Sequence, residues 1–206
     1  MSHKARQIVI VSEHFFSLLL FFFFEGYIYI DCGAEKDYQD EKTGFNYTSD
    51  RDFVSTGNIG FIPPGVQNKD FPSLARNLRF FPEGRRNCYT LKPEQGKNNN
   101  YMLRAYFQYG NYDGKNQPAT KFDLYIGVQY WGTIQLNVSS STYRTAFYYS
   151  PSDSISVCLV NTDTGVPLIS ALELRAVNSS IYRTDSEFST RHWLYDSGAA
   201  NNDTSR

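Results

Sequence analysis

The sequence is poor in the residue types that most often carry catalysis or bind metals. Its 206 residues include three His, two Trp, two Met and three Cys. Two histidines, His3 and His14, precede the bulk of the chain, and His192 lies near its end. The long segment between them therefore offers no imidazole for a Ser-His-Asp or Cys-His arrangement. No CxxC pair occurs, which argues against a zinc site.

The sequence also lacks an excess of basic residues. Its formal net charge is −1, with 20 Lys and Arg against 21 Asp and Glu. A nucleic-acid-binding protein of this size usually carries a basic footprint, so we predict no nucleic-acid partner. Aromatic residues are abundant instead, with 16 Tyr and 16 Phe. These side chains suit half-buried pleated surfaces and favour β structure. The length is enough for one domain with a real core.

The three cysteines are Cys32, Cys88 and Cys158. In a secreted protein they would form one disulfide and leave one thiol, which could pair with a segment outside this chain. The alternative is three buried, unpaired thiols. Their spacing does not decide between these arrangements.

An apolar run near the amino terminus is typical of a signal-peptide core. Residues 15–24 read FFSLLLFFFF, with Lys4 and Arg6 before them, and the run is shorter than the ~20 residues of a membrane span. The cleavage site is poor, because only Gly26 is small. Cleavage near Gly26, an uncleaved anchor, a mis-assigned start and a buried hydrophobic segment remain alternatives.

Four N-x-S/T sequons support the secretory pathway, and we predict N-glycosylation at their asparagines. They are Asn46, Asn137, Asn178 and Asn202. A single match of this kind arises easily by chance, so the argument depends on their combination with the leader.

Short alternating segments separated by turn signals predict an all-β sandwich. From Tyr101 to Tyr109 every second residue is apolar or aromatic, which is the period of a strand with one buried face. Other strands are predicted at 27–30, 78–81, 122–128, 131–136, 144–149, 154–160 and 168–177, whereas 36–52 is predicted as a polar loop. Roughly nine strands at this spacing match a sandwich of antiparallel strands. No segment after the leader shows a helical period.

A series of motifs resembles the plant malectin-like domain of leucine-rich-repeat receptor-like kinases. The motifs follow one another in family order from 27 to 180: YIYIDCG at 27–33, YTSD at 47–50, FVSTG at 53–57, LRFFPEG at 78–84, RNCYTL at 86–91, YGNYDGKNQ at 109–117, FDLYIG at 122–127, FYY at 147–149, VCLVNT at 157–162 and ISALELR at 169–175. The resemblance implies a malectin-like jelly-roll sandwich of about nine or more antiparallel strands.

The resemblance also implies a domain division. Residues 1–25 form the leader or anchor, 27–180 the malectin-like domain, and 181–206 a linker that begins a truncated second module. Family members continue into that module, leucine-rich repeats, a membrane span and a kinase. This sequence contains no Gly-rich loop with a following Lys, no HRD and no DFG. We therefore expect a non-catalytic protein without a cofactor.

One loop has the composition of a sugar-binding site. Tyr109, Asn111, Tyr112, Asp113 and Asn116 combine aromatic rings with planar polar groups, and loops at the ends of a sandwich often bind ligands. The alternative is structural: Tyr109 fits the buried face of its strand, and Asp113-Gly114 is ordinary turn chemistry.

Other polar and aromatic residues receive structural predictions. Asp123 and Glu173 are expected to face solvent from their strands, and Trp131 to pack in the core or at an edge. Asp31 and Arg175 are expected to pair across neighbouring strands. A glycosidase would need two carboxylates in one cleft, drawn from Asp113, Asp123, Asp153 and Glu173.

The leading hypothesis is an extracellular recognition module for a cell-wall glycan or a peptide, associated with the membrane through its leader or a partner. The alternatives are a protein-interaction module or decoy for receptor kinases, an unusual hydrolase, and a non-functional gene fragment.

Overall fold

The computed structural model describes residues 26–67, 74, 76–116 and 120–177. The predicted leader and the predicted tail lie outside these residues, as do Asn178, Asn202 and all three histidines. Within the described residues no helix is long and apolar enough to cross a membrane.

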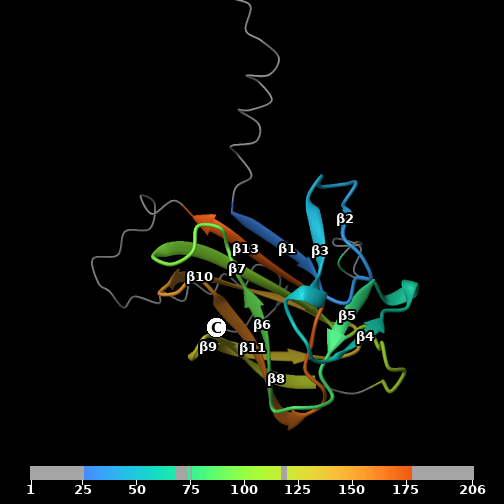
Figure 1. Cartoon of the computed structure of the whole chain (residues 1–206). Coiled ribbons are helices and arrows are strands. Elements are labelled where there is room, and N and C mark those ends of the chain that lie inside the picture. Colours follow the sequence, from blue (N-terminus) through green and yellow to red (C-terminus); the bar gives the residue numbers. More distant parts are fainter. Residues whose placement is uncertain (1–25, 68–73, 75, 117–119, 178–206) are drawn as a thin grey trace, which may run out of the picture.

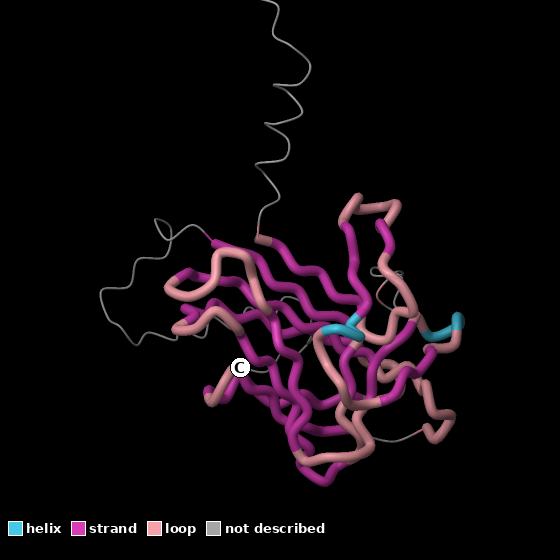
Figure 2. The backbone as a smooth tube through the Cα atoms, in the orientation of Figure 1, coloured by secondary structure: helices cyan, strands magenta, loops and turns pink. Residues whose placement is uncertain are grey.

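Strands dominate the described part of the chain (Figures 1 and 2). They are β1 Tyr27–Asp31, β2 Tyr38–Gln39, β3 Asn46–Ser49, β4 Asn58–Phe61, β5 Asn77–Phe80, β6 Arg86–Leu91, β7 Asn99–Gln108, β8 Thr120–Ile126, β9 Gln129–Leu136, β10 Ser141–Ser150, β11 Ile155–Thr164, β12 Leu168–Ile169 and β13 Ala171–Val177. Two 3-10 turns, η1 Asp50–Asp52 and η2 Pro64–Val66, are the helical elements of this part. The all-β prediction is confirmed.

The strands form three sheets. The first has the order β10-β7-β13-β1-β3-β2, the second β6-β11-β8-β9, and the third β12-β5-β4. In Figure 1 the six-stranded sheet lies above the four-stranded one, with β4 and β5 to the right. All strand pairs are antiparallel except β1 with β3, which is parallel.

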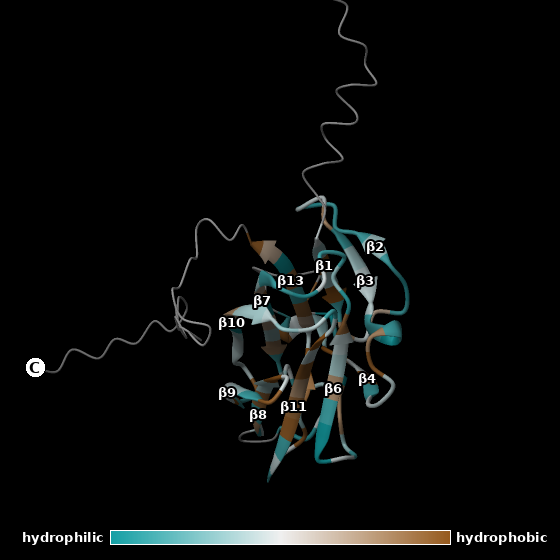
Figure 3. Cartoon of the chain, turned by 60° about the vertical axis from the view of Figure 1, so that its left-hand side comes forward, coloured by the Kyte–Doolittle hydropathy of each residue, from teal (hydrophilic) through white to brown (hydrophobic). Residues whose placement is uncertain are grey.

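The main core lies between the six-stranded and four-stranded sheets. The predicted alternation in β7 is confirmed, because Tyr101, Leu103, Ala105 and Phe107 are all buried. Three alternating residues of β11 that face them are also buried: Ile155, Val157 and Leu159. The hydropathy colouring of Figure 3 shows β11 as a strongly apolar strand. Trp131 packs in this core, as predicted.

The outer side of the six-stranded sheet carries a second, smaller cluster. Tyr29, Tyr47 and Ala171 are buried there, together with Leu74. The ring of Phe45 stacks on Tyr29 with centroids 4.7 Å apart. We name this cluster the closed face, because its aromatic rings are covered rather than exposed.

Two predictions about charged residues on the closed face are wrong. Glu173 does not face solvent, because it is 3% exposed and accepts a hydrogen bond from Arg175 at 2.9 Å. Asp31 does not pair with Arg175, since β1 and β13 place it opposite Ala171. Arg175 lies instead over the Tyr29 ring, 5.3 Å from its centroid.

Asp31 joins the six-stranded sheet to the three-stranded sheet. Its carboxylate accepts hydrogen bonds from the Tyr38 hydroxyl at 2.7 Å and from the Asn77 side-chain amide at 2.8 Å. Burial raises the pKa of Asp31 to about 6, although both hydrogen bonds act in the opposite direction. Tyr38 lies on β2 and Asn77 on β5, so this carboxyl links three strands.

A second buried carboxylate joins the small sheet to the four-stranded one. Asp50 is fully buried and forms a two-point ion pair with Arg79 of β5, at 2.5 and 2.7 Å. The Tyr89 hydroxyl of β6 donates to the same carboxylate at 3.0 Å. Asp50 and Asp31 thus fix the relative placement of all three sheets.

The cysteines divide into a pair and a single thiol. Cys88 and Cys158 lie directly opposite each other on β6 and β11 and form a disulfide, whereas Cys32 is buried and free. Burial raises the pKa of the Cys32 thiol well above its usual value. Cys32 is therefore held as an inert thiol inside the core.

Candidate functional site

The loop that follows β7 has a conformation fixed by its own hydrogen bonds. Asn111 and Asn116 both adopt positive φ, at 52° and 49°, which asparagine tolerates better than most residues. The Asn116 backbone N–H donates to the Asn111 side-chain oxygen at 2.8 Å, and the Gly114 N–H donates to the Asn111 carbonyl at 3.0 Å. The loop conformation is thus preorganised by its own hydrogen bonds.

Tyr109 lies beneath the loop rather than on its surface. It is 2% exposed, and its hydroxyl donates to Asp113 Oδ1 at 2.5 Å. A buried ring offers no stacking face, so Tyr109 positions Asp113. The Lys115 backbone N–H shares the same oxygen at 3.2 Å.

Tyr112 is half-buried between the loop and the small sheet. Its ring lies 4.8 Å from Phe80 and packs edge-on against Tyr109 at 5.6 Å. Burial raises its pKa, and the nearby Asp113 carboxylate adds to the shift. A Cβ at Gly60 would come within 2.7 Å of this ring, so a larger residue there would displace the Tyr112 ring.

Three exposed apolar residues on and after β4 were not singled out by the sequence analysis. Ile59 and Phe61 of β4 are 41% and 63% exposed, and Val66 of η2 is 41% exposed. The Gln108 side-chain amide donates to the Val66 carbonyl, which ties η2 to the end of β7. We name Ile59, Phe61 and Val66 the β4 patch. An exposed apolar residue has no sequence signature that separates it from a core residue.

The carboxylates considered for glycosidase chemistry lie in different places. Asp113 follows the end of β7, whereas Asp153 accepts a hydrogen bond from the Lys97 backbone just before β7 begins. A ten-residue strand spans about 30 Å, far more than the roughly 5–10 Å between paired catalytic carboxyls. Glu173 and Asp123 lie on the outer faces of different sheets. Neither of these two pairs therefore suits glycoside hydrolysis.

Two of the predicted glycosylation sites can be placed. Asn46 begins β3, and Asn137 follows β9; both are exposed. The Asn137 side-chain oxygen accepts the Ser139 backbone N–H at 3.2 Å within its sequon. Among the residues that the structure describes, no group of three or more His, Cys, Asp or Glu could hold a metal ion.

Sequence comparison identifies relatives among plant receptor kinases. The family model described as the malectin-like domain matches residues 30–203. A leucine-rich-repeat receptor-like serine/threonine-protein kinase of Arabidopsis thaliana is 41% identical over 177 residues, covering 84% of this chain and 20% of the relative. A receptor-like protein kinase of the same species is 41% identical over 166 residues, covering 79% of this chain and 18% of the relative. The chain spans about a fifth of the length of these relatives.

Solved structures of low sequence identity share the fold. The ANX2 ectodomain from Arabidopsis thaliana matches with a TM-score of 0.58 and 20% identity, covering 74% of this chain and 42% of that one. The plant receptor-like kinase FER matches with a TM-score of 0.62 and 15% identity, covering 77% and 43%. A third match, at a TM-score of 0.62, 11% identity and coverage of 75% and 49%, is FER in complex with the peptide RALF23 and with LLG2. The sandwich, the match of the family model to residues 30–203 and these relatives show that the chain belongs to the malectin-like family.

Proposed function

We propose that this chain is a non-catalytic extracellular recognition module and that the loop 109–116 contacts a saccharide. One observation carries the proposal: the loop is fixed by internal hydrogen bonds while its polar side chains lie at the surface. Lys115 and Asn116 are exposed, and Asn111 and Asp113 are partly exposed. A prebuilt loop loses little conformational entropy when it binds a ligand.

The cellular setting is part of the same proposal. The leader would direct the chain into the secretory pathway, where a disulfide such as Cys88–Cys158 persists and where Asn46 and Asn137 would receive glycans. Membrane association would come from the leader or from a partner receptor kinase. A cell-wall glycan is the ligand class that the loop's mixture of rings and planar polar groups fits best.

A binding measurement with matched asparagine variants tests the loop. Asn116→Gly keeps the positive φ but removes the side chain, and we expect it to weaken glycan binding at least fivefold by calorimetry. Asn98→Gly is the matched control, because Asn98 also has a positive φ (63°) but precedes β7 at its other end. The probes are neutral glucan and pectic hexasaccharides.

Equal affinity of wild type and Asn116→Gly would contradict the assignment of this loop. Failure of the folded wild-type chain to bind any of these probes would remove the saccharide proposal altogether.

The β4 patch supports a second candidate function, recognition of a peptide or a partner receptor. Phe61 is the most exposed of its three side chains, and a large exposed aromatic side chain is a frequent anchor in protein interfaces. The FER structure with the plant peptide RALF23 and LLG2 makes this peptide a reasonable probe. In this function the chain would modulate or compete with full-length receptors.

Titration with synthetic RALF23 separates this candidate from the first. We expect Phe61→Ser to weaken peptide binding at least tenfold and to leave glycan binding within twofold. Peptide binding that is unchanged by Phe61→Ser, or is absent in the wild type, would exclude the patch as the peptide site.

A further inference from the structure

The outer face of the four-stranded sheet carries an exposed aromatic group that the loop proposal does not use. Tyr130 of β9 is 50% exposed, and Val128 at the β8–β9 turn is 91% exposed. Tyr125 of β8 packs edge-on against Tyr130 with centroids 5.6 Å apart. We name the group formed by Arg86, Asp123, Tyr125, Val128, Tyr130 and Thr133 the β8–β9 ledge.

A β-bulge creates the ledge. Tyr125 pairs with Tyr130 while its neighbour Leu124 pairs with Gly132, so β9 has one extra residue at this point. The extra residue, Trp131, turns into the core and is 5% exposed. Bulges re-aim side chains, and this one sets Tyr130 beside Tyr125 on the outer face.

A hydrogen-bond chain fixes the Tyr130 ring. The Thr133 hydroxyl donates to Asp123 Oδ1 at 2.5 Å, which uses the one proton that the threonine hydroxyl has. The Tyr130 hydroxyl, 2.7 Å from Thr133 Oγ1, must therefore be the donor in that contact. The ring is held in place while half of its surface stays open to solvent.

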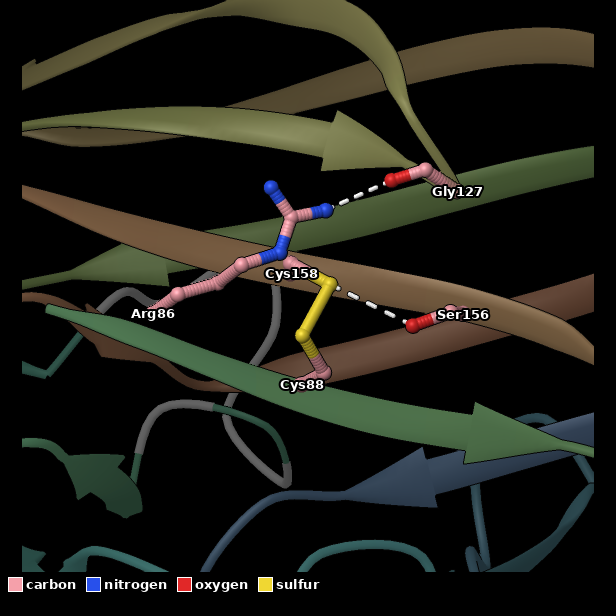
Figure 4. Close-up of a disulfide and its surroundings, with 5 residues drawn as sticks. All are labelled: Arg86, Cys88, Gly127, Ser156 and Cys158. Atoms are coloured by element: carbon pink, nitrogen blue, oxygen red, sulfur yellow. Dashed lines mark hydrogen bonds between the residues drawn. A yellow bond between two sulfur atoms is a disulfide. The ribbon is translucent and has the colours of Figure 1, made fainter. Parts of the chain in front are cut away.

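Arg86 completes the ledge from the neighbouring strand β6. Its side chain runs across the sheet above the Cys88–Cys158 disulfide, and its guanidinium donates to the Gly127 carbonyl at 2.6 Å (Figure 4). The guanidinium carbon lies 5.1 Å from the centroid of the Tyr125 ring. A guanidinium has five N–H donors in a rigid plane, so this contact leaves a preorganised donor set at the surface.

We propose that the β8–β9 ledge binds a neutral saccharide chain, as a second contact surface distinct from the loop 109–116; the inference rests on the proposed recognition function. The Tyr130 ring offers an apolar face for a sugar ring. Arg86 supplies donors for hydroxyl groups, and the Asp123 carboxylate supplies acceptors.

Two features of the ledge favour a neutral saccharide over a protein or an acidic glycan. Its formal charge is zero, with one arginine and one aspartate. Protein interfaces are built around an apolar core. On the described part of this sheet, however, Val128 and Tyr130 are the exposed large apolar residues, and the side chains around them on the outer face are polar or charged, including Thr133, Asp123 and Arg86.

Calorimetry on the purified secreted chain tests the ledge with cellohexaose and laminarihexaose as neutral probes and hexagalacturonic acid as the acidic comparator. We expect Tyr130→Ala to raise Kd for a neutral probe at least tenfold. Tyr149→Ala is the matched control, because Tyr149 is similarly exposed (53%) but lies on β10 of the other sheet. The Kd of this variant for the same probe should stay within twofold of the wild-type value. Arg86→Gln provides a second variant that keeps the aromatic rings, with an expected loss of about threefold or more.

The outcomes separate the ledge from the loop. If Asn116→Gly weakens saccharide binding while Tyr130→Ala and Arg86→Gln do not, the proposed binding at the ledge is wrong and the proposed function of the loop stands. If the wild type binds none of the probes, the ledge proposal and the saccharide proposal for the loop both fail. Equal losses in Tyr130→Ala and Tyr149→Ala, or tighter binding of hexagalacturonic acid than of either neutral probe, would also overturn the ledge.

Discussion

Tyrosine and arginine occur together on both outer faces of the sandwich, but with different exposure. On the closed face, Tyr29 is 7% exposed beneath Arg175, and Glu173 next to it is 3% exposed. On the β8–β9 ledge, Tyr130 is 50% exposed and packs against Tyr125, over whose ring Arg86 lies. Similar residue types thus form a second core on one side and an open surface on the other. Burial, rather than composition, distinguishes a structural group from a candidate binding group.

The largest expected effect concerns the covalent link beneath the ledge. Replacing both cysteines in Cys88→Ala/Cys158→Ala removes a cross-link between residues 70 positions apart. The chain-entropy relation gives a loss on the order of 4 kcal/mol in the free energy of unfolding. Urea denaturation measures it, with Cys32→Ala as a control in which no cross-link is lost. A double variant as stable as the control would contradict the expected loss.

The closed face should respond to pH through Asp31. Its pKa is about 6 in the folded state, against 3.8 for an ordinary aspartate, so between these two pH values the folded state holds a proton that the unfolded state has released. The free energy of unfolding should therefore fall as pH rises from about 4 to 7, by roughly 3 kcal/mol. The Asp31→Asn variant has no titrating carboxyl at this position, so it lacks this contribution to the pH dependence of stability.

Denaturant titrations of wild type and Asp31→Asn across this pH range isolate the effect. The difference between the two proteins should change by the full amount between pH 4 and pH 7. A constant difference would mean that Asp31 ionises normally, and the closed face would then be more hydrated than its burial indicates.

The smallest expected effects come from a matched pair of neutralising changes, one on each face. Glu173→Gln leaves Arg175 without its counter-ion on the closed face, and we expect a loss of about 2 kcal/mol. Asp123→Asn on the ledge should change stability by no more than about 0.5 kcal/mol, because its surroundings are partly open to solvent. Thermal unfolding of both variants checks this, and equal losses would remove the distinction between the faces.

The sequence predicted the long, regular strands well. β7 alternates cleanly over its whole length, and its buried residues were identified correctly. The strands that went unrecognised are short or polar: β2 has two residues, β3 reads NYTS, and β4 contains Gly60. β6, which reads RNCYTL, matched a family motif but was not predicted as a strand. Such strands exist because a distant partner pairs with them, and no local pattern encodes that partner.

The candidate site was predicted only in part, for the same physical reason. Loop composition located residues 109–116, and the alternation of β7 indicated that Tyr109 would be buried. The burial of Glu173 was missed because its compensation comes from Arg175 two residues later and from aromatic rings on other strands. The cysteine pairing depended on the register of β6 and β11, which spacing along the chain does not reveal.

The pairing of β1 with β13 sets an order of events during synthesis. The first and last described strands are neighbours in the middle of the six-stranded sheet, with Tyr27 opposite Arg175. The sheet cannot close until the ribosome has released residue 177, and such distant contacts form slowly. Until then the nascent chain keeps Asn46 and Asn137 accessible on an open polypeptide. If the chain enters the secretory pathway as proposed, glycan transfer to Asn46 and Asn137 can therefore begin before β13 completes the sheet, and both asparagines remain exposed afterwards.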